Sequence, residues 1–113
     1  MKRGPQEIKR ASQVFKALSH PHRLRIACLL IDGGPMSQKQ LVEELGLPQS
    51  SVARLLEPLR QTGLVVGLRQ GPELSLSVQG EVLSRMLDSM CAWFEEKAAR
   101  EAAEDGQSLG GQA

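Results

Sequence analysis

The sequence predicts a mainly α-helical fold with one small β-hairpin, in the order α-α-α-α-β-β-α. Two short helical segments joined by a tight turn lie between Met36 and Gly63. Leu74, Leu76 and Val78 alternate with Ser75 and Ser77, as in a half-buried return strand of a hairpin. Elsewhere apolar residues recur every three or four positions, the period of a helix. The length of 113 residues predicts one domain. We expect it to span residues 1–105, followed by a disordered tail rich in Gly and Gln at 106–113.

Two helices are predicted ahead of the central pair. Residues 6–18 place Ile8 and Phe15 on one apolar face. The second helix begins at Pro21, because proline is favoured at the first helical position, and His20 lies at its cap. Residues 32–35, Asp-Gly-Gly-Pro, end this helix.

The central pair of helices carries specific end signals. Ser37 is predicted to cap the first of them, and Gln40 three residues later completes a capping box. Gly46, Leu47 and Pro48 turn the chain into the second helix. That helix buries an apolar row and keeps polar residues at its start, and Pro58 is expected to cause a tolerated bend near its end. The pair therefore reads as a helix-turn-helix, whose second helix enters the major groove of DNA.

A hairpin and a long final helix complete the predicted fold. The first strand begins at Leu64, residues 70–73 form the bend, and residues 74–78 form the return strand. The final helix is expected from about Gln79 to Glu104. Helices followed by such a hairpin make a winged helix-turn-helix.

The charges are unevenly distributed although the net charge is only +1. Residues 1–25 contain one acid, Glu7, and seven basic residues: Lys2, Arg3, Lys9, Arg10, Lys16, Arg23 and Arg25. Residues 95–113 contain five acids against Lys97 and Arg100. A basic surface that faces DNA is therefore compatible with a nearly neutral chain.

Composition also indicates in which cellular compartment the protein is expected. The longest apolar run, Ile26–Ile31, is far too short to span a membrane. The two cysteines, Cys28 and Cys91, both fall in helical patterns, which favours free thiols in a reducing cytoplasm.

Polar residues with the chemistry to contact duplex DNA lie at three places. At the start of the second central helix, an amide can pair with adenine, hydroxyls with bases or phosphates, and a guanidinium with guanine or phosphate. Residues opening the preceding helix lie near the DNA backbone, and residues near the hairpin tip can reach a phosphate or the minor groove. The predicted contacts are Gln49, Ser50, Ser51 and Arg54, then Gln38 and Lys39, then Arg69 and Gln70. Ordinary solvent-facing positions are the alternative.

Two runs of the sequence resemble a known family. FKALSHPHRLRIACLL, followed by SQKQLVEELGLPQSSVARLLEPLRQTGLV and a hairpin, is similar to the ArsR/SmtB family of bacterial transcriptional regulators. The similarity covers roughly residues 11–88. It implies a homodimer, paired through the first and last helices, that binds an imperfect palindrome.

The residues also favour a dimer on their own. The last helix has a wider apolar face than one small domain needs, and all three aromatic residues lie on the terminal helices. We expect the interface to include Ile8, Phe15, Met86, Met90 and Trp93. An ordinary core role is the alternative for these side chains.

Many members of the family sense metals, but the resemblance does not extend to their ligands. The thiolate pair of the family would fall at Ser37 and Lys39. The carboxylate and imidazole positions would fall near Asp88, Met90, Glu101 and Glu104, where both imidazoles are missing. Thiolate or imidazole is needed to hold a transition metal well, so we expect no tightly bound cofactor.

Three residues remain candidates for weak nickel or zinc binding: His20, His22 and Cys91. The two histidines lie two residues apart at a helix start, so their side chains are expected to diverge rather than grip one ion. Cys91 could also act as a redox switch.

A second class of function stays open, a winged-helix module that binds proteins and whose DNA activity or sensing depends on a partner. An enzyme is disfavoured, since no nucleophile arrangement or phosphate-binding glycine loop is present. A palindromic duplex distinguishes the two classes, because only a DNA-binding regulator should shift it unaided.

Overall fold

The computed structural model describes the backbone of residues 3–112 and the side chains of residues 3–105. The chain divides into two compact units, Met1–Gln79 and Gly80–Ala113. The disordered tail expected at residues 106–113 falls where side chains lie outside the described residues, and it stays a prediction.

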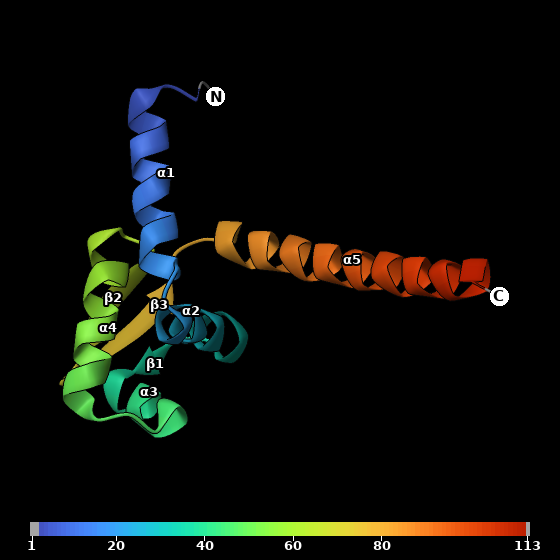
Figure 1. Cartoon of the computed structure of the whole chain (residues 1–113). Helices are drawn as coiled ribbons and strands as arrows, with labels where there is room; N and C mark the ends of the chain where they lie inside the picture. The colour runs from blue at the N-terminus through green and yellow to red at the C-terminus, as the bar shows by residue number, and fades with distance from the viewer. Residues whose placement is uncertain (1–2, 113) are drawn as a thin grey trace. The chain divides into compact units, whose positions relative to one another are not determined.

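The first unit contains four helices and a three-stranded sheet (Figure 1). The predicted fold class is confirmed, with one strand more than expected. The elements in chain order are α1 (Pro5–Leu18), α2 (Pro21–Gly33), β1 (Met36–Ser37), α3 (Gln38–Leu45), α4 (Gln49–Gln61), β2 (Val65–Gln70) and β3 (Glu73–Val78).

The sheet has the order β1-β3-β2, and both pairings are antiparallel. The hairpin is in register from Val65 opposite Val78 to Gln70 opposite Glu73, and Gly71 turns the chain with a φ of 64°. The short strand β1, which the sequence did not predict, pairs Met36 with Leu76. A two-residue strand is too short to show an alternating pattern, so it leaves no periodic signal.

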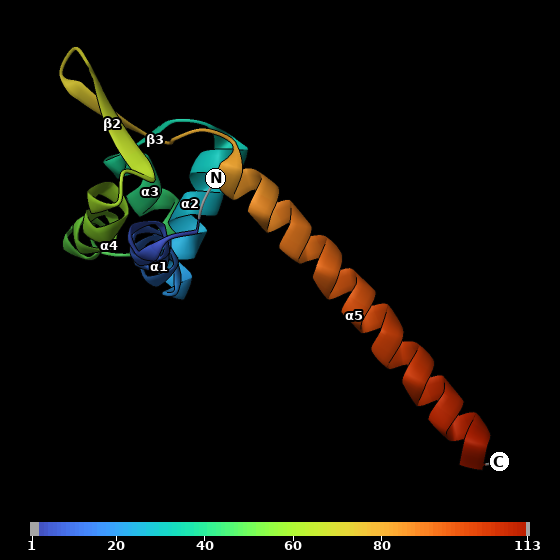
Figure 2. The ribbon, with the colours of Figure 1, turned by 90° about the horizontal axis from the view of Figure 1, so that it is seen from above.

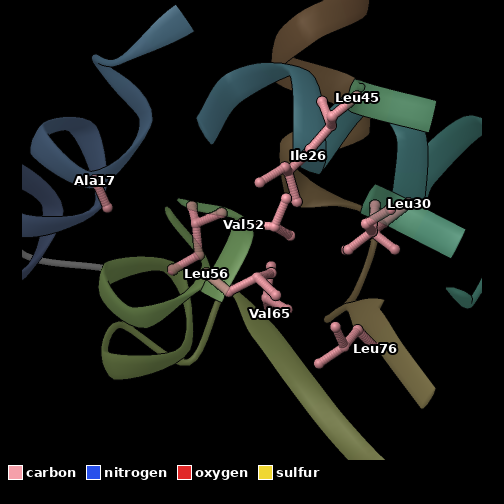
Figure 3. Packing of buried hydrophobic residues seen from close by; sticks show 10 residues of the cluster. Ala17, Ile26, Leu30, Leu45, Val52, Leu56, Val65 and Leu76 are labelled. Carbon is pink, nitrogen blue, oxygen red and sulfur yellow. The ribbon is translucent and has the colours of Figure 1, made fainter. Parts of the chain in front are cut away.

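Ten buried residues, contributed by all four helices and by both long strands, form the core of this unit (Figure 3). Ile26, Leu41, Val52 and Leu59 are completely buried. Full burial of one such side chain contributes about 1.5–3 kcal/mol. The complete cluster is Ala17, Ile26, Leu30, Leu41, Leu45, Val52, Leu56, Leu59, Val65 and Leu76.

The predicted start of α2 and both predicted ends of α3 are confirmed. The Ser37 hydroxyl accepts a hydrogen bond from the Gln40 amide at 3.2 Å, and the Gln40 side chain accepts one from the Ser37 amide at 2.8 Å. Gly46 ends α3 in the left-handed conformation, with a φ of 67°. His20 caps α2 by accepting the His22 amide hydrogen at 3.1 Å. These local bonds fix where α2 and α3 begin.

The second unit is the helix α5 (Val82–Gln112). It begins three residues later than predicted, because Gly80 has a φ of 72°, which no helix continues through. Its backbone is helical beyond the expected end at Glu104. Among the helices that the structure describes, none is long and apolar enough to cross a membrane.

Candidate nucleic-acid interface

Helix α4 separates its buried and exposed residues by face. Val52, Leu56 and Leu59 point into the core, as Figure 3 shows for the first two. Gln49 and Arg54 are exposed. An apolar row thus anchors the helix while polar side chains at its start remain available for base edges.

The start of α4 also presents backbone N–H groups that no helical hydrogen bond uses. The amides of Ser51 and Val52 both donate to the Pro48 carbonyl, at 3.0 and 3.1 Å. The amides of Gln49 and Ser50 therefore precede the first hydrogen bonds of the helix. Such amides, with the helix dipole behind them, favour a phosphate group. Ser50 is exposed, whereas Ser51 is half-buried and less available than the sequence suggested.

The two predicted contacts on α3 differ. Lys39 is exposed, as a phosphate contact requires. Gln38 is half-buried, and its side-chain amide donates to the Gln49 carbonyl at 3.5 Å. Gln38 therefore links the start of α3 to the start of α4 and contributes to the position of the reading end.

The predicted contacts of the wing lie at the end of β2. Figure 2 shows the β2–β3 hairpin projecting beyond the helices of the first unit. Arg69 and Gln70 are both exposed there, next to the turn at Gly71. The structure thus brings the eight candidates into three exposed or half-exposed groups of one unit, on α3, on α4 and at the hairpin.

A cleft between α4 and the sheet is lined in part by Arg60, a further candidate for the interface that the sequence did not indicate. The cleft has a volume of about 510 Å³ and is lined by Gln38, Ala53, Leu56, Glu57, Arg60, Gln61, Leu74 and Leu76. A Cβ atom added at Gly67 of β2 would lie 3.2 Å from Nη2 of Arg60. The available signal was Gly67 itself, since a glycine inside a strand often marks a close approach.

Known proteins are similar to this chain in sequence and in fold. A family described as "Domain of unknown function (DUF7343)" matches residues 17–79, more than half of the chain, so the chain belongs to it. The HTH-type transcriptional regulator NmtR of Mycobacterium tuberculosis is 37% identical over 88 residues, which cover 75% of this chain and 72% of the relative. The chain belongs to the ArsR/SmtB-type winged helix-turn-helix transcriptional regulators.

Solved structures agree with this assignment of the regulator. The crystal structure of Rv0081 from M. tuberculosis matches with a TM-score of 0.74 and 26% identity, over 88% of this chain and 98% of that one. The winged helix-turn-helix domain of Mb0332 from Mycobacterium bovis, a homodimer in solution, matches in fold. Its TM-score is 0.73 at 24% identity, over 85% of this chain and 88% of that one.

The residues at the metal positions of this family do not fit a transition metal in the regulator. The Ser37 hydroxyl is engaged in the capping box, and Lys39 offers an ammonium group, which has no lone pair to donate. No cluster of three or more His, Cys, Asp or Glu side chains suited to an ion occurs among the described residues.

The three weak metal candidates fall into two places, a pair of histidines on the first unit and Cys91 on the second. The rings of His20 and His22 lie side by side with centroids 5.4 Å apart, so the expectation that they diverge is wrong. The cause is the cap, in which Nδ1 of His20 accepts the His22 amide hydrogen and is thereby occupied. Cys91 lies exposed on α5, in the other unit.

The predicted interface residues of the regulator are largely exposed. Ile8 and Phe15 on α1 are 59% and 56% exposed, and Met90 and Trp93 on α5 are 47% and 49% exposed. Met86 is half-buried. Phe94, which the sequence analysis did not include, is equally exposed and its ring lies 5.3 Å from that of Trp93. Large apolar side chains in such numbers are typical of a surface that another protein covers.

Proposed function

We propose that this regulator acts as a homodimer that binds a palindromic operator through the N-terminal end of α4. The observation that carries the proposal is the polar start of α4, where Gln49 and Arg54 are exposed above a fully buried apolar row. In this role Gln49 pairs with adenine and Arg54 with guanine or phosphate. Ser50, Ser51, Gln38, Lys39, Arg69 and Gln70 add base or backbone contacts.

The dimer is proposed from the exposed apolar residues of α1 and α5 and from the homodimeric state of Mb0332. A two-fold axis places the two reading helices about 34–36 Å apart, or at a multiple of that spacing, which matches half-sites on one face of the duplex. The regulator would act in the cytoplasm, where bacterial DNA lies.

We further propose that the regulator holds no tightly bound cofactor. A metal response would then come from weak nickel or zinc binding at His20, His22 or Cys91, or through a separate sensor protein. Calorimetry with Zn²⁺ and Ni²⁺ on tag-free protein tests this. Submicromolar, stoichiometric binding that also changes DNA affinity would contradict the proposal.

Binding to duplex DNA is tested by selecting bound genomic fragments and measuring affinity for the selected palindrome and for random duplex. The protein should shift the palindrome unaided, and affinity should fall steeply with salt as counterions are released. Replacing both Gln49 and Arg54 by Ala should abolish the preference for the palindrome.

The matched control replaces Gln6 and Arg10 on α1, both exposed, by Ala. It removes the same charge and should keep the ratio of specific to random affinity. An unchanged ratio in the Gln49 and Arg54 variant would remove α4 as the reading helix. Failure of the wild type to bind any palindrome would favour the protein-interaction module instead.

A further inference from the structure

A second concave region lies at the C-terminal half of α4, within the first unit. It has a volume of about 500 Å³, opens to solvent, and is lined by residues of α1, of α2, and of the C-terminal end of α4 with Thr62 after it. Its lining consists of Gln13, Lys16, Ala17, Arg23, Pro58, Gln61 and Thr62. None of these residues belongs to the predicted DNA contacts or to the predicted interface.

The charge of this lining has one sign. Lys16 and Arg23 contribute two cations, and no lining residue is an acid. Within the described residues, neither cation forms an ion pair. A pocket with two cations that lack counter-charges attracts anions.

Arg23 is held in place beside the pocket. Its Nε donates to the Ala17 carbonyl at 2.6 Å, and its Nη2 donates to the Lys16 carbonyl at 3.4 Å. A guanidinium has five N–H donors, so these two bonds orient the group and leave the others for a ligand.

The remaining walls are neutral. Gln13 and Gln61 offer amide groups that form no hydrogen bond within the described residues, whereas the Thr62 hydroxyl already donates to the Leu59 carbonyl at 2.9 Å. Pro58 and Ala17 supply apolar surface. The lining therefore combines two cations with neutral polar and apolar groups, which suits a small organic anion rather than an inorganic ion alone.

The geometry points to a binding site for a small metabolite with a carboxylate or phosphate group, in the pocket between α1, α2 and α4. Lys16 and Arg23 bind the oxyanion, and the amides of Gln13 and Gln61 bond the neutral part of the ligand. Charge-assisted bonds of this kind are the strong ones.

The pocket is connected to the reading end through α4 itself. Arg54, Pro58 and Gln61 follow at intervals of four and three residues, so they share one face of the helix. A bound anion would add negative charge to this face about 10 Å along the helix from Arg54. We expect the bound anion to weaken DNA binding. This regulatory effect rests on the proposed function, whereas the binding site itself does not.

The site is tested on the full chain by NMR titration with citrate and, separately, glycerol 3-phosphate. Either anion should give saturable shifts at Gln13, Gln61 and Arg23, and the anion that binds identifies the carboxylate or the phosphate source. Lys16→Gln should weaken binding about tenfold, the effect of one lost charge-assisted bond. Lys9→Gln removes an exposed α1 cation outside the pocket and should leave binding unchanged.

Absence of saturable shifts with both anions, or equal weakening by Lys9→Gln, would overturn the site. So would a Lys16→Gln variant that loses DNA affinity while neither anion binds, since the cations would then contact DNA phosphates. Anion binding that leaves DNA affinity unchanged would support the site and remove only its regulatory effect. These outcomes keep the failure of the site distinguishable from failure of the proposed function.

Discussion

Helices α4 and α5 carry apolar residues at similar helical spacing but expose them very differently. In α4, Val52 and Leu59 are fully buried. In α5, Met90, Trp93 and Phe94 are each about half exposed, and residues 91–105 are all exposed. Apolar periodicity thus predicts a face that must be covered, but it does not say whether the same chain or another one covers it.

The two helices should therefore respond differently to substitution. Packing around α4 comes from α1, α2, α3 and the sheet of its own unit, so changes there should affect folding. The exposed face of α5 should affect association. Four substitutions, from the largest expected effect to the smallest, test this division.

Trp93→Glu should convert the dimer to monomers and abolish tight palindrome binding, while circular dichroism still shows a folded first unit. A charge buried in an apolar interface without a partner costs several kcal/mol. Sedimentation at micromolar concentration measures the outcome. Ala99→Glu is the matched control, since it adds the same charge on the opposite side of α5. A monomeric wild type under these conditions would end the dimer proposal.

Leu59→Ala should destabilise the fold by about 2–5 kcal/mol, because it leaves a cavity where α4 packs into the core. Denaturant unfolding at several protein concentrations separates this loss from any change in association. Leu68→Ala, at a position of the hairpin that is 61% exposed, should change stability by no more than about 0.5 kcal/mol. Similar losses in the two variants would show that the core is placed wrongly.

Arg54→Ala should weaken binding to the palindrome by about 1–3 kcal/mol if the guanidinium contacts a base, with little change in stability. Fluorescence anisotropy at fixed salt gives the affinity for specific and random duplex. Arg10→Ala, which removes an exposed arginine of α1, should weaken both duplexes equally. Equal weakening by Arg54→Ala would make that residue a phosphate contact.

Ser37→Ala should cost about 1 kcal/mol of stability through loss of the cap at the start of α3. The backbone pairing of Ser37 with Ser75 does not involve the hydroxyl that the change removes. Thermal unfolding measures the difference. Ser12→Ala, whose hydroxyl bonds only the Lys9 carbonyl one turn back, is the control and should be close to neutral. A neutral Ser37→Ala would show that the capping box contributes nothing to α3.

The parts of the fold that sequence predicted correctly are those fixed by neighbours along the chain. The capping box at Ser37, the left-handed Gly46 and the turn at Gly71 all depend on residues within a few positions. The late start of α5 could not be predicted in this way. The Gln79 amide donates to the Leu64 carbonyl at 2.9 Å, which extends the sheet by a contact fifteen positions away.

The same distinction holds at the candidate interface. The polar start of α4 followed from periodicity, whereas the bond from Gln38 to the Gln49 carbonyl and the approach of Arg60 to Gly67 join separate elements. Contacts of this kind depend on tertiary packing, and a single sequence carries little information about them.

Strand β1 has a mechanical consequence for the regulator. Ser37 pairs with Ser75 of the wing and also caps α3, so a single residue belongs to both the sheet and the helix-turn-helix. The wing is thereby joined directly to α3, the first helix of the helix-turn-helix. We expect an operator whose half-site is lengthened by one base pair to be accommodated by distortion of the DNA, at an elastic cost, rather than by movement of the wing.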